Sequence, residues 1–247
     1  MFRCNSAAMT WLGSFGAVAL QTNYREWLRG AIGVLLGIAL TGAIATAWFG
    51  SANGLPLLIA PLGASAVLLF GVPASPLAQP WPILAGNTVS AAIGVACAHG
   101  IGSPLAAAAA SVALAFAAMS VLRCVHPPGG AVALSAVIGG PYVAQLGYEF
   151  ILAPVLLNSA LLAIGAVLYN NLTGRSYPHR AHAPEHPHPP RRTVVLEEED
   201  FAAVLADYGE TLDISREDLE VLYRELLGRA ENKRHRPAMV GQGELDL

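Results

Sequence analysis

The chain has 247 residues, of which 54% are hydrophobic and 13% are charged, and its formal net charge is −3. A soluble domain carries about 25% charged residues, yet no Asp, Glu, Lys or Arg occurs here from residue 30 to residue 122. This distribution excludes an ordinary soluble fold and predicts an all-α, polytopic membrane protein whose partner is the lipid bilayer. No basic patch interleaved with aromatic residues occurs, so nucleic acid is not expected as a partner.

The predicted elements begin with residues 1–26, whose mildly apolar run favours an interfacial helix over a secretory signal peptide. A membrane domain follows at residues 27–173, where a spanning helix needs roughly 20 apolar residues. Four segments meet that length and predict ordinary spans: 27–49, 83–101, 105–122 and 150–172. Two other apolar segments, 55–72 and 127–143, contain several Gly and Pro residues and predict broken or re-entrant helices.

After the last predicted span the composition changes. Residues 174–196 are rich in His and Pro and predict a flexible linker, with metal binding by the histidines as the alternative. Residues 197–230 show two apolar stripes at helical spacing and predict a small cytoplasmic helical tail, while residues 231–247 are expected to be disordered. No cofactor or metal site is expected. The three cysteines have no CxxC spacing, and Cys97 and Cys124 are interpreted as buried apolar side chains.

The two broken segments resemble each other. Residues 61–68 (PLGASAVL) align with residues 127–134 (PPGGAVAL), and each is followed by a span with an Asn and a Gly at the same spacing: Asn87 with Gly94, and Asn158 with Gly165. The pattern predicts a duplicated unit of span, broken segment and span. If both broken segments cross the bilayer, there are six crossings and the repeats are inverted; if both are re-entrant, there are four. Basic residues at both ends of the domain place both termini in the cytoplasm, and Arg123 modestly favours six crossings.

The run from His126 through Pro127, Pro128 and Gly129 to Gly130 is the most unusual string in the chain. A helix starting after Pro128 would present free amides at the positive end of its dipole, which is a ready anion site. The alternative is a structural helix break with no ligand. Arg123 lies three residues before His126. It either supplies charge to that site or ends its helix at the headgroup level, where its side chain can reach water.

The first repeat offers an uncharged counterpart of this helix start, with Gly63 and Ser65. Asn87 and Asn158 either bond across helices or line a polar path. Glu149 is either a proton-coupling carboxylate or, more in keeping with its place at a span boundary, an interfacial side chain. No catalytic set, P-loop or dinucleotide fingerprint occurs, so enzymatic activity is not expected.

These residues favour a transporter or channel for a small anion, in which Arg123 supplies charge and His126 orients the anion or shares a proton. Small residues throughout the spans indicate tight helix packing and a homo-oligomer. The alternative is a membrane-anchored sensory or scaffold protein that acts through its cytoplasmic tail.

Three strings together resemble the HPP family of integral membrane proteins: residues 126–131 (HPPGGA), 61–71 (PLGASAVLLFG) and 75–80 (SPLAQP). The resemblance covers about residues 20–173 and implies four spans. It also implies nitrite as the first candidate substrate, because plastid and cyanobacterial members are similar to nitrite transporters, with nitrate next. Many bacterial members continue into nucleotide-sensing CBS domains, which are not expected in these 247 residues. A bacterial inner membrane is the expected location.

Overall fold

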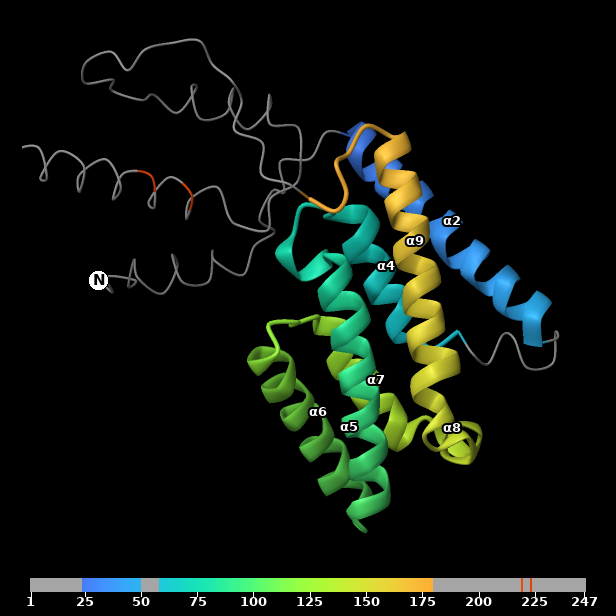
Figure 1. Ribbon diagram of the computed structural model, residues 1–247, viewed down its shortest axis with the longest axis vertical. Coiled ribbons are helices and arrows are strands. Elements are labelled where there is room, and N and C mark those ends of the chain that lie inside the picture. Colours follow the sequence, from blue (N-terminus) through green and yellow to red (C-terminus); the bar gives the residue numbers. More distant parts are fainter. Residues whose placement is uncertain (1–23, 50–57, 180–218, 220–222, 224–247) are drawn as a thin grey trace, which may run out of the picture.

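The structure is a computed structural model that describes residues 24–49 and 58–179, together with Leu219 and Tyr223. Every regular element within residues 24–49 and 58–179 is helical (Figure 1). The predicted helical tail, the disordered end, nearly all of the N-terminal segment and most of the His- and Pro-rich linker lie outside the described residues. The all-α, polytopic architecture predicted from the sequence is confirmed in the described part.

Four helices are long and apolar enough to cross a bilayer, and they match the four ordinary spans predicted from the sequence. They are built on α2 (Tyr24–Phe49), α5 (Asn87–Gly100), α6 (Pro104–Val121) and α9 (Asn158–Leu172). Two π-helices, η3 (Pro82–Gly86) and η4 (Ile151–Leu157), directly precede α5 and α9 and lengthen them. Without these extensions, α5 and α9 would be too short to span a hydrocarbon core of about 30 Å.

The two predicted broken segments are short helices, α4 (Pro61–Gly71) and α7 (Pro127–Ile138). At about 1.5 Å per residue, neither reaches across a bilayer by itself. Each has Pro in its first turn, where the missing N–H removes no helical hydrogen bond. After Gly139 the chain bends by 93° into α8 (Gly140–Leu146), which interrupts the second segment as the sequence predicted.

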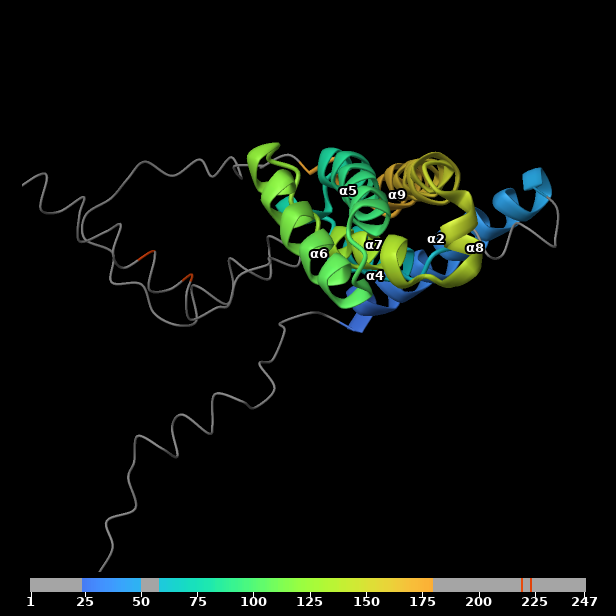
Figure 2. The ribbon, with the colours of Figure 1, turned by 90° about the horizontal axis from the view of Figure 1, so that it is seen from below.

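The order of the elements repeats in the way that the predicted duplication requires. A long helix, a short helix and a π-extended long helix occur first as α2, α4 and α5, and then as α6, α7 and α9. The last helices are exchanged between the halves, since α9 packs on α2 and α4 while α5 packs on α6 and α7. Figure 1 shows α5 and α9 running in opposite directions, so the two halves are inverted. Seen from below, α5 and α9 lie side by side along one face, with α6 at the edge (Figure 2).

The short helices carry the chain back along the bundle rather than turning it around at one end. Arg29 Nη2 donates to the Phe70 carbonyl at 2.9 Å, so the end of α4 lies beside the beginning of α2. At the opposite end, the His99 ring of α5 lies 5.6 Å from the Tyr148 ring, which follows α7 and α8. These contacts favour six crossings over four, and the crossing number stays a prediction.

Candidate functional site

A group of buried polar side chains gathers around the starts of α4 and α7. Its members are at most 1% exposed: Ser65, Asn87, Ser90, His126, Asn158 and Ser159. Burying a polar group among apolar helices costs free energy unless the group is hydrogen-bonded. Within membrane domains, such groups more often serve a function than fill space. This cluster is therefore the candidate site, and it includes His126, Ser65, Asn87 and Asn158 from the sequence prediction.

His126 connects the two short helices. It precedes α7, its Nε2 lies 2.8 Å from Ser65 Oγ of α4, and its Nδ1 lies 2.9 Å from the Leu77 carbonyl oxygen. Because a carbonyl oxygen can only accept, Nδ1 must carry a proton, and in the neutral ring Nε2 accepts the Ser65 hydroxyl proton. Both ring nitrogens are thus used to hold α4, α7 and the segment at residues 72–81 together.

Asn87 and Asn158 occupy equivalent positions, each being the first residue of its α-helix after a π-helix. Asn87 Nδ2 donates to Ser159 Oγ of α9 at 3.1 Å, so Asn87 bonds across helices, which is one of the two roles predicted for it. Asn158 Nδ2 instead donates to the Pro154 carbonyl of its own helix at 2.9 Å. Asn87 Oδ1 is buried and accepts no hydrogen bond from any described residue, so it is available to a donor that enters the bundle.

The amides at the start of α7 are less available than the sequence predicted. The helix begins at Pro127 rather than after Pro128, and the Gly129 N–H already donates to the His126 carbonyl at 2.8 Å. Gly129 also packs tightly, because a Cβ there would lie 2.7 Å from Ser90 Oγ.

The packing at the start of α4 is looser. Gly63 aligns with Gly129 in the repeat and is only partly buried, and a Cβ there would meet no atom of another described element within 4 Å. Gly130 is only partly buried, and its nearest neighbour would be a Val112 methyl group at 3.7 Å. The start of α4 is therefore less tightly packed at Gly63 than the start of α7 is at Gly129, although the Gly63 N–H also already donates, to the Ala60 carbonyl at 3.0 Å.

Arg123 is not drawn into this cluster. Its side chain is exposed at the end of α6, and no described residue makes a hydrogen bond or ion pair with its guanidinium. Its backbone closes the helix: the Cys124 N–H donates to the Met119 carbonyl at 2.9 Å, and the Arg123 N–H donates to the Ser120 carbonyl at 3.2 Å. This pair of bonds is a Schellman motif. The placement agrees with the helix-ending role that the sequence left open.

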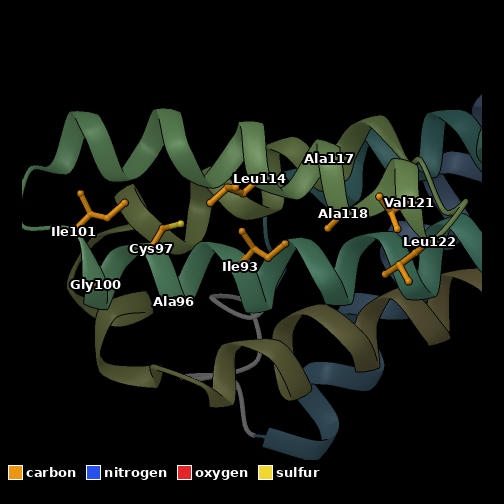
Figure 3. A pocket seen from close by; sticks show the side chains of 10 residues that line it. All are labelled: Ile93, Ala96, Cys97, Gly100, Ile101, Leu114, Ala117, Ala118, Val121 and Leu122. Carbon is orange, nitrogen blue, oxygen red and sulfur yellow. The ribbon is translucent and has the colours of Figure 1, made fainter.

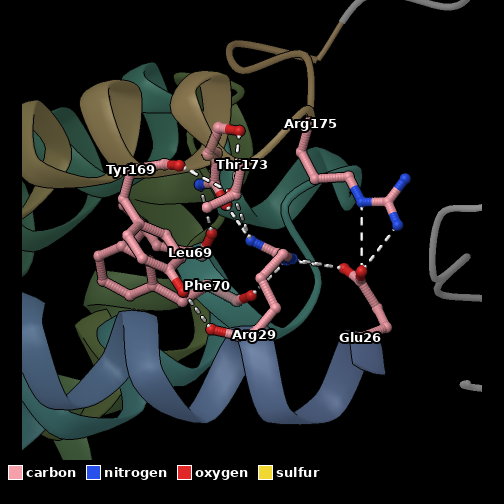
Figure 4. A network of polar contacts seen from close by, with 8 residues as sticks. Glu26, Arg29, Leu69, Phe70, Tyr169, Thr173 and Arg175 are labelled. Atoms are coloured by element: carbon pink, nitrogen blue, oxygen red, sulfur yellow. Dashed lines mark hydrogen bonds and ion pairs between the residues drawn. The ribbon is translucent and has the colours of Figure 1, made fainter. Parts of the chain in front are cut away.

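Sequence reasoning missed a second polar group, at the end of the bundle where α2 begins (Figure 4). The Glu26 carboxylate forms ion pairs with Arg29 and with Arg175, each at 2.7 Å. Arg29 also donates to Asn170 Oδ1 at 2.8 Å and to the Phe70 carbonyl at 2.9 Å. A cation at the C-terminal end of α4 stabilises the negative end of that helix dipole. In the sequence, the one signal for this polar group was the three-residue spacing of Glu26 and Arg29, which suits an ion pair on a helix.

The segment that holds His126 is itself fixed from the end of α9. Tyr177, which is 2% exposed, donates its hydroxyl proton to the Ala78 carbonyl at 2.7 Å. Burial raises the pKa of the Tyr177 phenol, so it stays a donor at neutral pH. Gln79 Oε1 accepts from the His179 N–H at 2.8 Å. The site therefore depends on residues from both repeats and from the segment that follows them.

Comparisons with known proteins agree with this architecture. Residues 19–178 match the family model described as HPP, transmembrane region. One transmembrane protein of Dictyostelium discoideum is 34% identical over 178 residues, which are 68% of this chain and 53% of that protein. A second from the same organism is 38% identical over 126 residues, 49% of this chain and 40% of that protein.

The chain thus spans about half the length of the curated relatives it matches. No solved structure matches it at a significant level. The family match covers all the helices from α2 to α9, including the two short helices that build the candidate site. This chain is an integral membrane protein and belongs to the HPP transmembrane family.

Proposed function

We propose that the chain is a transporter or channel for a small inorganic anion, with nitrite as the first substrate to test and nitrate as the second. The observation that carries the proposal is the meeting of two short-helix starts inside the bundle, joined by the 2.8 Å contact between Ser65 and His126. Both helices direct the positive ends of their dipoles into the interior. Inverted repeats with broken helices, and substrate held between the repeats, recur among transporters.

In this proposal the anion binds beside Gly63 and contacts the first turn of α4. The Ser65 hydroxyl turns from His126 to donate to the anion, which frees the imidazole Nε2. A proton on Nε2 then makes His126 a cation beside the anion, so uptake of a proton balances the charge. Asn87 and Asn158 line the path, and Gly129 and Gly130 let the backbone of α7 approach it. Arg123 is not required, because its guanidinium lies outside the cluster.

The proposed topology follows the positive-inside rule. Arg29 and Arg175 lie at the same end of the bundle, joined through Glu26, and cationic residues near the ends of spans favour the cytoplasmic side. Both termini then lie in the cytoplasm, and a bacterial inner membrane is the proposed location. Close helix approaches, such as Gly37 against the Phe70 ring, are typical of membrane helices that also associate with copies of themselves.

The test is anion flux into proteoliposomes that contain the purified chain, measured for nitrite and then for nitrate. Ser65→Ala removes the donor from the site, and we expect the initial rate to fall about tenfold or more, as for the loss of one buried hydrogen bond to an anion. Ser135→Ala is the matched control, because Ser135 is only partly buried on α7 and its hydroxyl bonds to its own helix, at the Ala131 carbonyl.

Equal rates in the two serine variants would show that the anion does not pass Ser65. If neither nitrite nor nitrate enters faster than into empty vesicles, the anion proposal fails. The sensory or scaffold role of the cytoplasmic tail would then take its place.

A further inference from the structure

A groove runs between α5 and α6 on the outer side of the bundle (Figure 3). Its volume is about 680 Å³, and it is lined by aliphatic residues, by glycine and by one thiol. From Leu114 to Leu122, α6 contributes about 12 Å of its length. That length approaches the thickness of one leaflet of the hydrocarbon core, which is about 15 Å.

Both helices that form the groove are candidate membrane spans. Of the two, α6 is the less enclosed, since 22% of its 18-residue apolar stretch is buried. Val121 is 83% exposed and Leu122 is 48% exposed at one end of the groove. In a bilayer this surface meets acyl chains or another protein. An acyl chain gains no hydrophobic free energy by moving from lipid to the groove, because both surroundings are apolar. A particular lipid is therefore retained only if its headgroup is held as well.

Arg123 supplies a group that can hold a headgroup. It follows Leu122 directly, where the groove ends, and its exposed guanidinium has no hydrogen bond or ion pair with any described residue. It is also the one Asp, Glu, Lys or Arg in the sequence between residues 30 and 148. Trp81 marks the same level, since its indole N–H donates to the Leu122 carbonyl at 3.4 Å and its side chain is 60% exposed. Exposed Trp residues gather at the boundary between hydrocarbon and headgroups.

The backbone of Arg123 gives an independent reason to look for a role of its side chain. Its φ is 52°, in the left-handed region, at the position of a Schellman motif that glycine usually occupies. An arginine there carries a backbone cost that glycine would avoid. A residue kept in such a conformation points to a use for its side chain.

We propose that the groove and Arg123 together bind one anionic phospholipid. An acyl chain lies between α5 and α6, and the lipid phosphate accepts hydrogen bonds from the guanidinium. The planar guanidinium matches two phosphate oxygens with parallel N–H donors, and a negative headgroup neutralises the one cation at this end of α6. This lipid site is separate from the proposed anion path, since it lies on the outer surface of the bundle.

The headgroup contact is tested by native mass spectrometry of the detergent-purified chain, with phosphatidylglycerol or phosphatidylcholine added. We expect the wild-type chain to retain phosphatidylglycerol about fivefold more strongly, as one arginine near an anionic surface provides. Arg123→Gly removes the side chain and relieves the left-handed backbone, so the variant folds at least as well and loses the preference. Arg123→Lys keeps the charge, and we expect it to retain much of the preference for phosphatidylglycerol.

The groove is tested separately with Ala117→Phe, because Ala117 lines it. We expect this variant to lose bound phosphatidylglycerol, while Ala109→Phe, exposed on the same helix and outside the groove, keeps it. Equal retention of the two lipids by the wild-type chain, or an unchanged preference in Arg123→Gly, would overturn the proposal. A change in the mass of the oligomer in Ala117→Phe, with the bound lipid unchanged, would overturn it too and would show an interface between copies of the chain.

Discussion

His126 is buried and Arg29 is largely buried, and the side-chain nitrogen atoms of both connect helices far apart in the sequence. His126 uses both ring nitrogens, one on Ser65 and one on Leu77. Arg29 places donors on the Glu26 carboxylate, on Asn170 and on the Phe70 carbonyl. Each residue thereby fixes one end of α4: His126 holds it near its beginning and Arg29 holds its last turn. The position of the candidate site consequently depends on a charged group at the far end of the same short helix.

Arg29→Gln is expected to destabilise the domain by about 3 kcal/mol, because it leaves the Glu26 carboxylate with one ion pair fewer and uncaps the carbonyls of α4. The side chains of Arg29 and Glu26 are each only 11% exposed, so water replaces little of the lost interaction. Arg25→Gln is the control, since Arg25 is exposed one turn earlier and its loss should change stability by less than about 0.5 kcal/mol. Thermal unfolding in detergent measures both. A similar fall in the two variants would mean that general surface charge, and not the Arg29 contacts, stabilises this end.

At the scale of elements, the sequence revealed the repeat but not its geometry. The matching Asn and Gly residues predicted equivalent spans, and both Asn residues do begin an α-helix behind a π-helix. The π-helices themselves could not be predicted from apolar composition. Pro154 removes the amide that would continue the α-helical ladder in η4, but a proline in a span is equally compatible with a simple kink. The left-handed Arg123 was hidden for a similar reason, because the usual glycine signal for that helix end is absent.

The two glycines of the repeat are predicted to respond to alanine in opposite ways. A Cβ at Gly94 would lie 2.5 Å from the Ala133 carbonyl oxygen of α7, a backbone atom that cannot turn aside. Gly94→Ala is therefore expected to cost about 1–3 kcal/mol through overpacking. At Gly165 no atom of another described element lies within 4 Å of where a Cβ would stand, so Gly165→Ala should stabilise α9 by up to about 1 kcal/mol. Thermal unfolding of the two variants in detergent measures both changes in stability. A loss at both positions would mean that α9 packs against another protein surface at Gly165.

For the molecule as a whole, the least predictable feature is the exchange of α5 and α9 between the halves. Hydrophobic periodicity identifies a span but does not say which other span it contacts, and small residues on nearly every face leave many pairings open. The exchange matters for the candidate site, because it places α5 and α9 at the boundary between the two halves. The Asn87 amide reaching Ser159 across that boundary is a direct sign of it. From the residues alone, His126, Ser65 and the Asn pair could be identified as candidates, but their assembly depends on this pairing.

The same arrangement fixes what a topology experiment should find. Tyr177 donates to the Ala78 carbonyl at 2.7 Å, so the segment after α4 and the segment after α9 lie at the same end of the bundle. Single cysteines at Pro76, Gly102 and Ser176, in a chain whose native cysteines are replaced by alanine, are labelled with a membrane-impermeant maleimide in cells and in inverted vesicles. With six crossings, Pro76→Cys and Ser176→Cys react from the cytoplasmic side and Gly102→Cys from the other. With four crossings, Pro76→Cys instead reacts from the side opposite to Ser176→Cys, while Gly102→Cys joins Ser176→Cys. That second pattern would require α4 to leave the membrane where it entered, and the inverted-repeat site between α4 and α7 would have to be abandoned.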